Sequence, residues 1–315
     1  MKILFCGVTF VSAVDHLKKL LPEHEVVNCP NENLISAARD AQVLIPLMAK
    51  IDRSVLEVGP PMLVQQWGVG LEGVDIESAT ELGVKVCNVP GDTTPNADST
   101  AEHAVFLMMG LSRKIRDCFL SLRNGVCGTP VGQALFGRRA LIVGFGKVGQ
   151  ALARKLTALG MQVDVIRRTA VPNLEKEIGV NRTGDSSELL DMARTADFVI
   201  STVTLTNVTR NLFDMSLFTN MKTSAFVVNV SRGPVINENE LISALNNHLI
   251  AGAGLDVFAT EPVDIKSPLL FMENVLATPH IAGVTEQNYV AIGELVKENI
   301  LRVTRGERPN YCVNC

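Results

Sequence analysis

Long hydrophobic runs are missing from this chain of 315 residues. No apolar stretch approaches the roughly 20 residues that a membrane-spanning helix needs. The apolar start Met1–Gly7 is too short for a signal peptide and is interrupted by a glycine. An excess of one charge is also missing, since 29 basic and 33 acidic residues leave a formal net charge of −4. This balance predicts neither a nucleic-acid nor a membrane partner, and we expect a cytoplasmic protein.

A disulfide framework and a metal site are not evident either. Seven cysteines are scattered at positions 6, 29, 87, 118, 127, 312 and 315. An odd number without framework spacing fits reduced thiols in a cytosolic protein. Cys312 and Cys315 form one C-x-x-C pair, but a zinc site needs a second pair or nearby histidines. We therefore expect no bound metal, and a frayed tail around this pair.

Repeats and low-complexity segments are also lacking, and short apolar strands alternate with helices along the chain. The expected strands are Ile3–Val8, Val26–Cys29, Val43–Leu47, Leu63–Trp67, Val84–Asn88, Ala140–Val143, Gln162–Ile166, Phe198–Thr202, Ala225–Val230, Leu249–Leu255 and Val275–Ala277. The expected helices are Asp15–Leu21, Asn96–Arg116, Gln150–Leu159, Ser187–Ala193, Asp214–Phe218, Glu238–Asn246 and Glu286–Arg305. A loop is expected over Asn124–Phe136. This alternation predicts two α/β units, each with its own sheet.

The clearest motif lies in Arg139–Thr169, where a strand, a glycine turn, a helix and a second strand follow one another. Gly144, Gly146 and Gly149 have the spacing G-x-G-x-x-G. The first glycine permits a tight turn, the second lets a pyrophosphate approach the backbone, and the third lets the helix pack on the strand. The helix N-terminus offers N–H groups and a positive dipole end to phosphates. In this context the motif predicts dinucleotide binding, and an ordinary glycine-rich turn is the alternative.

Three side chains suited to acid–base and anion chemistry follow later strands. Arg232, Glu261 and His280 each come after an expected strand, and the carboxyl ends of strands in an open α/β sheet are where ligands bind. Arg232 offers a planar fork of donors for a carboxylate or carbonyl oxygen. A carboxylate beside an imidazole favours the protonated ring, which makes such a pair a general acid near neutral pH. Singly, the arginine reads as a surface ion pair and the histidine as a core residue, but together they favour a catalytic site.

The remaining histidines are weaker candidates. His16, His24, His103 and His248 are interpreted as solvated or capping residues. No Ser-His-Asp or Cys-His arrangement stands out by spacing.

Several stretches in the same order resemble the D-isomer-specific 2-hydroxyacid dehydrogenases, with glyoxylate/hydroxypyruvate reductases and phosphoglycerate-dehydrogenase-like members. Besides the glycine unit, they are VCNVPG at Val86–Gly91, AEHAVFLMMGLSR at Ala101–Arg113, NVSRGPVIN at Asn229–Asn237, GLDVFATEP at Gly254–Pro262 and TPHIAGVT at Thr278–Thr285. The resemblance extends from Met1 to about Asn310. A set of ordered motifs is far more specific than any one of them.

The resemblance implies a fold of two doubly wound parallel-sheet α/β domains with a cleft between them. A flavodoxin-like substrate-binding (catalytic) domain would be discontinuous, comprising residues 1–95 and 286–315. A Rossmann dinucleotide-binding domain would comprise residues 96–285. A homodimer through the nucleotide-binding domain is also implied.

The resemblance also implies roles for single residues. Arg232 would bind the substrate carboxylate and carbonyl, and His280 would be the acid–base residue with Glu261 as its partner. Substrate-binding residues would be Met48, Trp67, Val69 and Gly70, the last two through backbone amides in the loop Gly68–Gly70. Cofactor-binding residues would be Gly144, Gly146, Lys147, Val148, Gly149, Arg167, Arg168, Val203, Thr204, Thr209, Val230, Ser231, Asp256, His280 and Gly283. Asp256 would orient the nicotinamide carboxamide.

Two departures from the family pattern affect specificity. In the loop Gly68–Asp75, Glu72-Gly73 stands where the family often has Asp-Asn or Asp-His, which leaves the substrate side chain open. After the second strand of the glycine unit, Arg167 and Arg168 stand where NAD-dependent members usually carry Asp. An arginine pair attracts a 2′-phosphate and can bind it bidentately, whereas Asp164 lies too early in the strand to reach the ribose. We therefore expect NADP(H) to be preferred and NAD(H) to be possible, with solvent-facing arginines as the alternative.

The predicted activity is reversible hydride transfer between NAD(P)H and a small 2-oxo acid such as glyoxylate, hydroxypyruvate or pyruvate. The alternative is a non-catalytic nicotinamide-dinucleotide sensor resembling the corepressors among these relatives. A formate-type dehydrogenase fits less well, because that branch resembles a Gln–His pair and this chain has Glu261. The sequence leaves the physiological substrate open.

Overall fold

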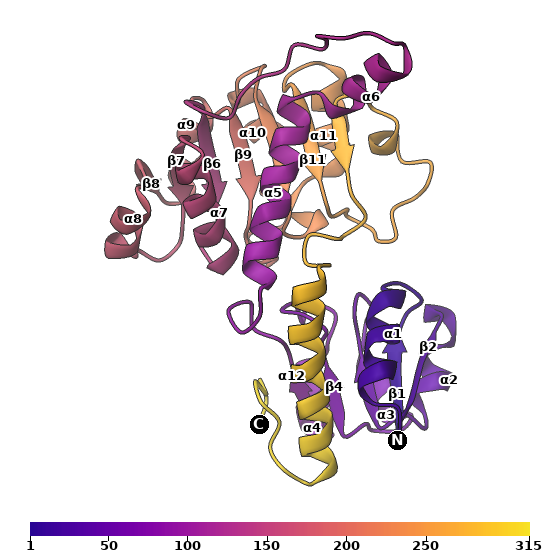
Figure 1. The fold of residues 1–315 in the computed structure, drawn as a ribbon. Helices are drawn as coiled ribbons and strands as arrows, with labels where there is room; N and C mark the ends of the chain where they lie inside the picture. The colour runs from indigo at the N-terminus through magenta and orange to yellow at the C-terminus, as the bar shows by residue number, and fades with distance from the viewer. The chain divides into compact units, whose positions relative to one another are not determined.

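The computed structural model describes residues 1–315, and the chain divides into two compact units. We call Met1–Pro95 with Thr285–Cys315 the terminal unit, and Asn96–Val284 the central unit. Figure 1 shows that each unit is a sheet covered by helices. No helix is both long enough and apolar enough to cross a lipid bilayer.

The terminal unit contains a five-stranded parallel sheet of order β2-β1-β3-β4-β5, which is the flavodoxin-like order. Its strands are β1 (Lys2–Cys6), β2 (Glu25–Cys29), β3 (Val43–Ile45), β4 (Leu63–Gln65) and β5 (Lys85–Cys87). Its helices are α1 (Val11–Leu20), α2 (Leu34–Ala38), α3 (Arg53–Glu57), α4 (Ile76–Glu81) and α12 (Glu286–Thr304). Helix α12 packs on α1, so the C-terminal segment joins the N-terminal one in a single unit.

The central unit contains a seven-stranded parallel sheet of order β12-β11-β10-β9-β6-β7-β8. Its strands are β6 (Arg139–Val143), β7 (Gln162–Ile166), β8 (Arg182–Gly184), β9 (Phe198–Ser201), β10 (Phe226–Asn229), β11 (Gly252–Leu255) and β12 (Val275–Ala277). Its helices are α5 (Asn96–Ser112), α6 (Ile115–Arg123), α7 (Lys147–Ala158), α8 (Pro172–Ile178), α9 (Leu189–Ala193), α10 (Met215–Asn220) and α11 (Glu238–Asn246). The order reverses between β6 and β9, as in a Rossmann sheet.

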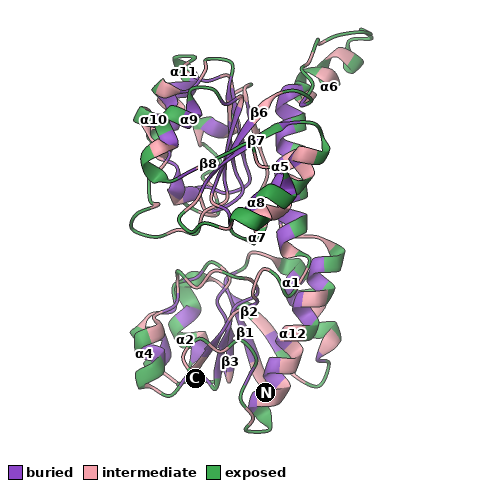
Figure 2. Cartoon of the chain, turned by 90° about the vertical axis from the view of Figure 1, so that its left-hand side faces the viewer, coloured by how far each residue is buried: buried purple, intermediate pink, exposed green.

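Apolar residues on both faces of each sheet explain this layering. In the central unit, side chains of α5 and α7 pack on one face, and side chains of α9, α10 and α11 pack on the other. Most strand residues are buried in both units, while the outer faces of the helices are exposed (Figure 2). Strands buried on both faces read as continuous apolar runs, which is why the sequence shows them clearly. The predicted fold of two doubly wound parallel sheets is confirmed.

The predicted helix Asn96–Arg116 is wrong at its C-terminal end. Helix α5 ends at Ser112, Lys114 adopts a left-handed backbone with a φ of 51°, and α6 begins at the next residue. None of the residues of α6 is buried. No residue of α6 packs into the core of its own unit, so no packing holds this segment on the axis of α5.

The sequence pattern does not predict several short helices and one short strand. Helices α2, α3 and α4 have five or six residues, too few to show a helical period. Strand β8 reads RTG and has no apolar run, so its pairing with β7 and not its composition makes it a strand.

The expectations of a frayed tail and of reduced thiols throughout are both wrong. Cys312 and Cys315 form a disulfide. The tail lies along β5, where the Val313 amide donates to the carbonyl oxygen of Val86 over 2.8 Å. The Asn314 side chain accepts from the amide of the same Val86 over 2.8 Å. Strand β5 is at the edge of its sheet, and the tail satisfies backbone groups that the edge would leave unpaired.

Candidate active site

The glycine turn after β6 has the geometry of a phosphate-binding turn. Gly144 has a φ of 103°, and a Cβ at this position would lie 2.9 Å from the backbone of Thr202. A Cβ at Gly149 would lie 2.2 Å from the carbonyl oxygen of Gly144, so these two positions require glycine. At Gly146, by contrast, a Cβ would meet nothing within 4 Å. Gly146 caps α7 without a side chain, and this open backbone at a helix N-terminus fits a pyrophosphate.

The two arginines at the end of β7 have different surroundings. The Arg167 guanidinium forms an ion pair with Glu175 of α8, and its Nη2 also lies 3.4 Å from the Thr183 hydroxyl. Glu175 is buried, so this ion pair is internal to the unit. Arg168 is exposed. Of the two predicted phosphate ligands, Arg168 is therefore the accessible one.

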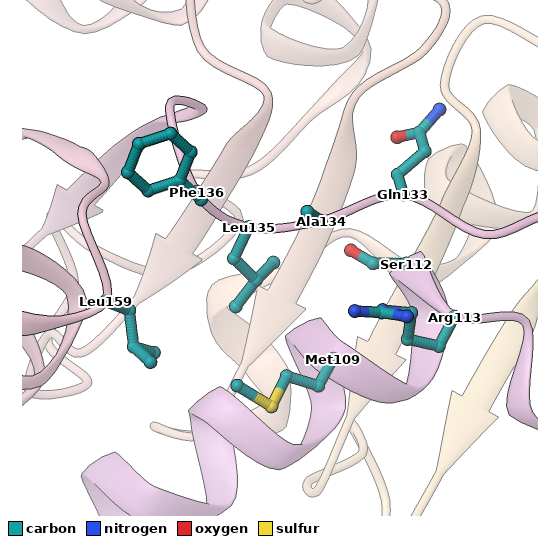
Figure 3. Close-up of a pocket in the computed structure, with 8 residues that line it drawn as sticks. All are labelled: Met109, Ser112, Arg113, Gln133, Ala134, Leu135, Phe136 and Leu159. Carbon is teal, nitrogen blue, oxygen red and sulfur yellow. The ribbon is translucent and has the colours of Figure 1, made fainter.

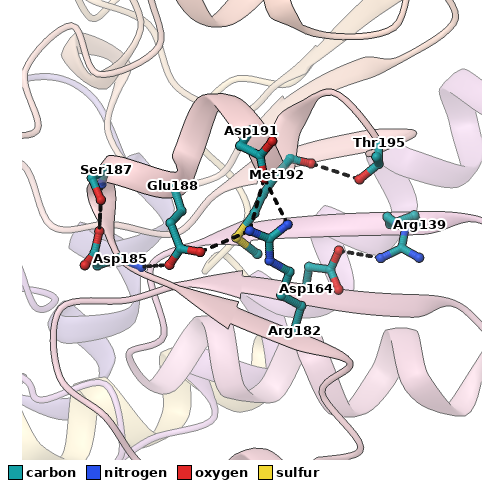
Figure 4. A network of polar contacts seen from close by, with 9 residues as sticks. All are labelled: Arg139, Asp164, Arg182, Asp185, Ser187, Glu188, Asp191, Met192 and Thr195. Carbon is teal, nitrogen blue, oxygen red and sulfur yellow. Dashed lines mark hydrogen bonds and ion pairs between the residues drawn. The ribbon is translucent and has the colours of Figure 1, made fainter.

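Neighbouring charges on β7 and β8 are likewise paired within the unit (Figure 4). Asp164 is buried and accepts from Arg139 Nη1 over 2.7 Å. Arg182 of β8 contacts Glu188 and Asp191 at 3.0 and 3.1 Å. The first pair joins β6 to β7, so Asp164 is engaged within the sheet, and the other two join β8 to the segment at and before α9.

The other residues implied for cofactor binding lie on two loops at the same sheet edge. In the loop after β9, which includes Val203, the Thr209 hydroxyl donates to the carbonyl oxygen of Thr204 over 2.7 Å. In the loop after β10, which begins at the buried Val230, the Ser231 and Ser201 hydroxyl oxygens are 2.7 Å apart. Both loops are therefore shaped by their own side chains.

Arg232 follows β10 and is half-buried. Arg232 Nη1 donates to the carbonyl oxygen of Ser231 over 2.9 Å. The carbonyl oxygen of Arg232 in turn accepts from Asn229 Nδ2 over 3.0 Å. A Cβ at Gly233 would lie 1.8 Å from the backbone of Phe258, so the chain after β10 runs directly against the chain after β11. This contact places Arg232 beside the segment that carries Glu261.

Glu261 and His280 meet as predicted from their places at strand ends. His280 Nδ1 lies 2.6 Å from Glu261 Oε2. The other oxygen of Glu261 accepts from the Phe258 amide over 2.8 Å, so the carboxylate is held on both sides. The His280 and Glu261 side chains are 26% and 12% exposed, so the pair is partly shielded from solvent.

Asp256 is 1% exposed and lies at the end of β11. Its carboxylate accepts from the Thr278 hydroxyl over 2.7 Å and from the amides of Ile281 and Ala282 over 2.9 Å each. Burial raises the pKa of Asp256, but hydrogen bonds from His103, Thr278 and the two amides outweigh it, and the pKa lies below its ordinary value. The observed partners of the Asp256 carboxylate belong to the turn after β12 and to α5. In the same turn, Gly283 follows the last of these amides.

Sequence reasoning missed His103. The interpretation of this α5 residue as solvated or capping is wrong, because its side chain is 13% exposed and its Nε2 lies 3.3 Å from Asp256 Oδ1. The available signal was its place among buried alanines, since Ala101 and Ala104 are both fully buried.

The residues implied for substrate binding lie in the terminal unit. Met48 and Val69 are exposed. Trp67 is 6% exposed, and its ring packs 5.8 Å from that of Phe5 and 5.9 Å from that of Tyr289. The ring of Trp67 therefore belongs to the core of this unit.

The loop Gly68–Gly70 is oriented by its carbonyl groups. The carbonyl oxygen of Gly68 accepts from the Val89 amide over 2.8 Å, and that of Val69 accepts from Asn88 Nδ2 over 2.8 Å. In a planar trans peptide the N–H of the next residue points opposite to the carbonyl. The amides of Val69 and Gly70 consequently point away from these partners.

A Rossmann sheet whose carboxyl edge carries a glycine turn, an arginine and a Glu–His pair defines a dinucleotide-dependent oxidoreductase. Comparison with known proteins supports this class. Residues 105–282 match the model of the D-isomer specific 2-hydroxyacid dehydrogenase NAD-binding domain. The chain belongs to the D-isomer-specific 2-hydroxyacid dehydrogenase family.

Relatives and solved structures extend the similarity to nearly the whole chain. The glyoxylate reductase of Pyrococcus furiosus is 36% identical over 296 residues, which cover 90% of this chain and 86% of that protein. The apo-structure of D-lactate dehydrogenase from Escherichia coli has a TM-score of 0.86 at 25% identity, over 99% and 100% of the two chains. An NADPH-dependent glyoxylate/hydroxypyruvate reductase from Sinorhizobium meliloti, in complex with NADP and malonate, has a TM-score of 0.83 at 27% identity, over 99% and 96%.

Proposed function

We propose that this member of the family reduces a small 2-oxo acid to a D-2-hydroxy acid, with glyoxylate, hydroxypyruvate and pyruvate as candidate substrates. The observation that carries the proposal is the 2.6 Å contact between His280 Nδ1 and Glu261 Oε2 in the unit that holds the glycine turn. The names of the glyoxylate reductase relatives support glyoxylate as the first substrate to test.

The central unit would hold the cofactor, and the terminal unit would bind the substrate. A nicotinamide dinucleotide, when bound, supplies the hydride that reduces the carbonyl carbon. Gly144, Gly146 and Gly149 would admit its pyrophosphate, since the turn combines open backbone with a helix N-terminus. Lys147 and Val148, in the first turn of α7, would face the same group.

Arg232 and the amides of Val69 and Gly70 would hold the substrate. The guanidinium fork matches a carboxylate and its neighbouring carbonyl oxygen. In the terminal unit, the amides of Val69 and Gly70 point away from the partners of the loop carbonyls, and backbone N–H groups of this kind suit a carboxylate. Donors arranged in advance in this way orient the oxo acid and stabilise the charge that develops on its oxygen.

His280 would move the proton. Because Nδ1 faces Glu261, Nε2 is the ring nitrogen that exchanges a proton with substrate. Reduction requires the imidazolium, which gives its Nε2 proton to the carbonyl oxygen; oxidation requires the neutral ring as base. Glu261 keeps the Nδ1 proton in place, so that the neutral ring has its lone pair on Nε2.

The cofactor preference we propose is for NADP(H), with Arg168 as the principal ligand of the 2′-phosphate. Arg168 is exposed, whereas Arg167 is already paired with Glu175. Arg167 would not be the primary contact, because Glu175 already balances its charge. NAD(H) remains a possible second cofactor.

We further infer a homodimer through the central unit. Helix α6 has Phe119, Leu120 and Leu122 exposed, the last of them 71%, and the loop that follows adds Val131. Where this loop returns to the body, Phe136 is exposed beside a pocket that opens between α5 and the loop (Figure 3). Large apolar side chains on a protruding helix favour a covering partner, and the second copy that the family resemblance implies fits them.

The dimer is tested by the oligomeric state. Phe119→Glu with Leu122→Glu places charges on the apolar face of α6, and sedimentation should then show a monomer. The matched control is Arg123→Glu at the end of the same helix, which should remain dimeric. A wild-type monomer at all concentrations would contradict the inference.

The reaction is tested by consumption of NADPH and NADH with glyoxylate, hydroxypyruvate and pyruvate. Turnover with at least one acid, and formation of the D-isomer where the product is chiral, is the expected result. Cofactor binding without turnover of any acid would favour the sensor alternative instead.

A further inference from the structure

His103 lies outside the glycine turn and the Arg–Glu–His set, yet it contacts both segments that converge on His280. It projects from α5, and its Nε2 lies 2.8 Å from the hydroxyl oxygen of Thr278 and 3.3 Å from Asp256 Oδ1. Its ring is nearly buried. Helix α5, β11 and the turn after β12 thus meet at one imidazole.

The direction of the hydrogen bonds follows from the number of protons available. A threonine hydroxyl has one proton, and that of Thr278 is donated to Asp256 Oδ1 over 2.7 Å. The hydroxyl oxygen can then only accept from His103, so Nε2 must carry a proton. This holds for the neutral ring and for the charged ring alike, and it sets the tautomer of the neutral ring.

Asp256 transmits this arrangement to the catalytic turn. Its carboxylate accepts from the amides of Ile281 and Ala282, and its carbonyl oxygen accepts from the amide of His280 over 2.8 Å. His280 has a φ of 55°, a left-handed conformation that a residue with a Cβ avoids unless its surroundings impose it. The bonds to Asp256 flank this residue on both sides and impose it.

We propose that His103 is a positioning residue of the proposed reductase reaction: its Nε2–H orients the Thr278 hydroxyl and the Asp256 carboxylate, which together hold the turn that presents His280 to Glu261. The proposal rests on the proposed function of this site. The low pKa of Asp256 agrees with it, since His103 is the first of the hydrogen-bond donors that keep the buried carboxylate charged.

A role limited to filling space is the alternative, and side chains of similar size separate the two. His103→Leu fills the site without a donor, whereas His103→Gln keeps an N–H that can reach the hydroxyl. Thr278→Val removes the hydroxyl, and Thr278→Ser restores it. Phe106→Leu is the matched control, because this exposed ring lies 5.5 Å from the His103 ring and takes no part in the hydrogen bonds.

The first measurement needs neither substrate nor cofactor. Labelled histidine side chains are followed by NMR as the pH is varied, and the signals of His280 are assigned with His280→Gln. We expect the His280 titration to change in His103→Leu and in Thr278→Val, and to be wild-type in Thr278→Ser and Phe106→Leu. This readout remains valid if wild-type protein reduces no 2-oxo acid, so failure of the proposed function is distinguishable from failure of the positioning role.

The second measurement is steady-state kinetics. His103→Leu should lower kcat about tenfold to hundredfold with little change in KM, because small displacements of a catalytic group act on the chemical step. His103→Gln should recover part of the loss, and His103→Leu with Thr278→Val should be no worse than either alone, since both break the same connection. If His103→Leu does not fold, the Thr278→Val and Thr278→Ser pair decides. An unchanged His280 titration in the variants that lack the donor or the hydroxyl overturns the proposal.

Discussion

Two regions of the carboxyl edge of the central sheet, the segments after β10–β12 and the glycine turn after β6, are organised in opposite ways. At the β10–β12 end, the polar side chains are tied to one another: Glu261 is held by His280 and a backbone amide, and Asp256 by Thr278 and further amides. In the glycine turn after β6, side chains are absent instead: Gly146 presents open backbone and no capping side chain. Catalytic groups must be aimed within fractions of an ångström, whereas a pyrophosphate needs room and a helix dipole.

The carboxyl end of β7 combines features of both regions. Arg167 is tied to a buried carboxylate in the manner of the catalytic end, whereas its neighbour Arg168 is exposed. Adjacent residues of the same type thus have different surroundings. Because the guanidinium of Arg167 is already held by an internal carboxylate, the exposed Arg168 is the stronger candidate ligand for a phosphate.

Removing the Arg232 side chain should have the largest effect on the proposed reaction. Arg232→Ala should lower kcat/KM for 2-oxo-acid reduction by about 10²- to 10³-fold, because the oriented fork is lost from the transition state. Arg232→Lys should recover only part of it, since an ammonium lacks the planar fork. Cofactor binding, followed by fluorescence titration, should stay unchanged. Near wild-type kcat/KM in the alanine variant would contradict the role of Arg232.

Neutralising Glu261 should change the same reaction in a different way. Glu261→Gln keeps the shape but removes the charge that favours imidazolium at His280. Reduction should therefore decline at lower pH than in the wild type, because the acid form is lost earlier as pH rises. The measurement is kcat/KM against pH for reduction, with chemistry shown to be rate-limiting. Coincident profiles would mean that Glu261 is not the partner of His280.

Substitutions at the end of β7 sharpen the comparison of the two arginines. Arg168→Ala should lower kcat/KM for NADPH by about tenfold to hundredfold, as expected for loss of a charge-assisted hydrogen bond, with little effect on NADH. Arg167→Ala should have the smaller effect, because Glu175 already holds its guanidinium. Both cofactors are compared at fixed ionic strength, because salt screens the contact. A wild-type enzyme that uses NADH as well as NADPH would refute the preference and leave the dehydrogenase function standing.

The smallest expected effect is on stability. Asp256→Asn should lower the free energy of unfolding at neutral pH by about 1–3 kcal/mol, because a charged acceptor of several hydrogen bonds is lost. The depressed pKa of Asp256 means that its contribution is present above the ordinary aspartate pKa and is lost as pH falls through the folded value. The gap between wild type and variant should therefore narrow in acid. Urea unfolding at several pH values checks this, and a gap that widens in acid would contradict it.

Much of the site was predictable because its parts lie at strand ends. The alternation of apolar strands and helices predicts parallel sheets, and parallel strands bring their carboxyl ends to one edge. Glu261 and His280 follow successive strands, β11 and β12, so their meeting could be inferred before any distance was known. What could not be inferred is which partners each side chain takes at that edge, as the ion pair of Arg167 with Glu175 illustrates.

The two sheets, the glycine turn and the set of candidate catalytic groups could be predicted from the amino-acid sequence, because they depend on local periodicity, on residues without a Cβ and on chemistry at strand ends. The three-dimensional structure was needed to show that Arg167 pairs with Glu175, that the tail of the chain lies along β5, and that His103 of α5 reaches Asp256. The tail and His103 meet partners that are distant in the chain, and Arg167 meets Glu175 across the turn between β7 and α8, so no helical or strand period encodes these contacts. They form because burial leaves each polar group with few partners, and only the complete fold settles which of them lie within hydrogen-bonding distance.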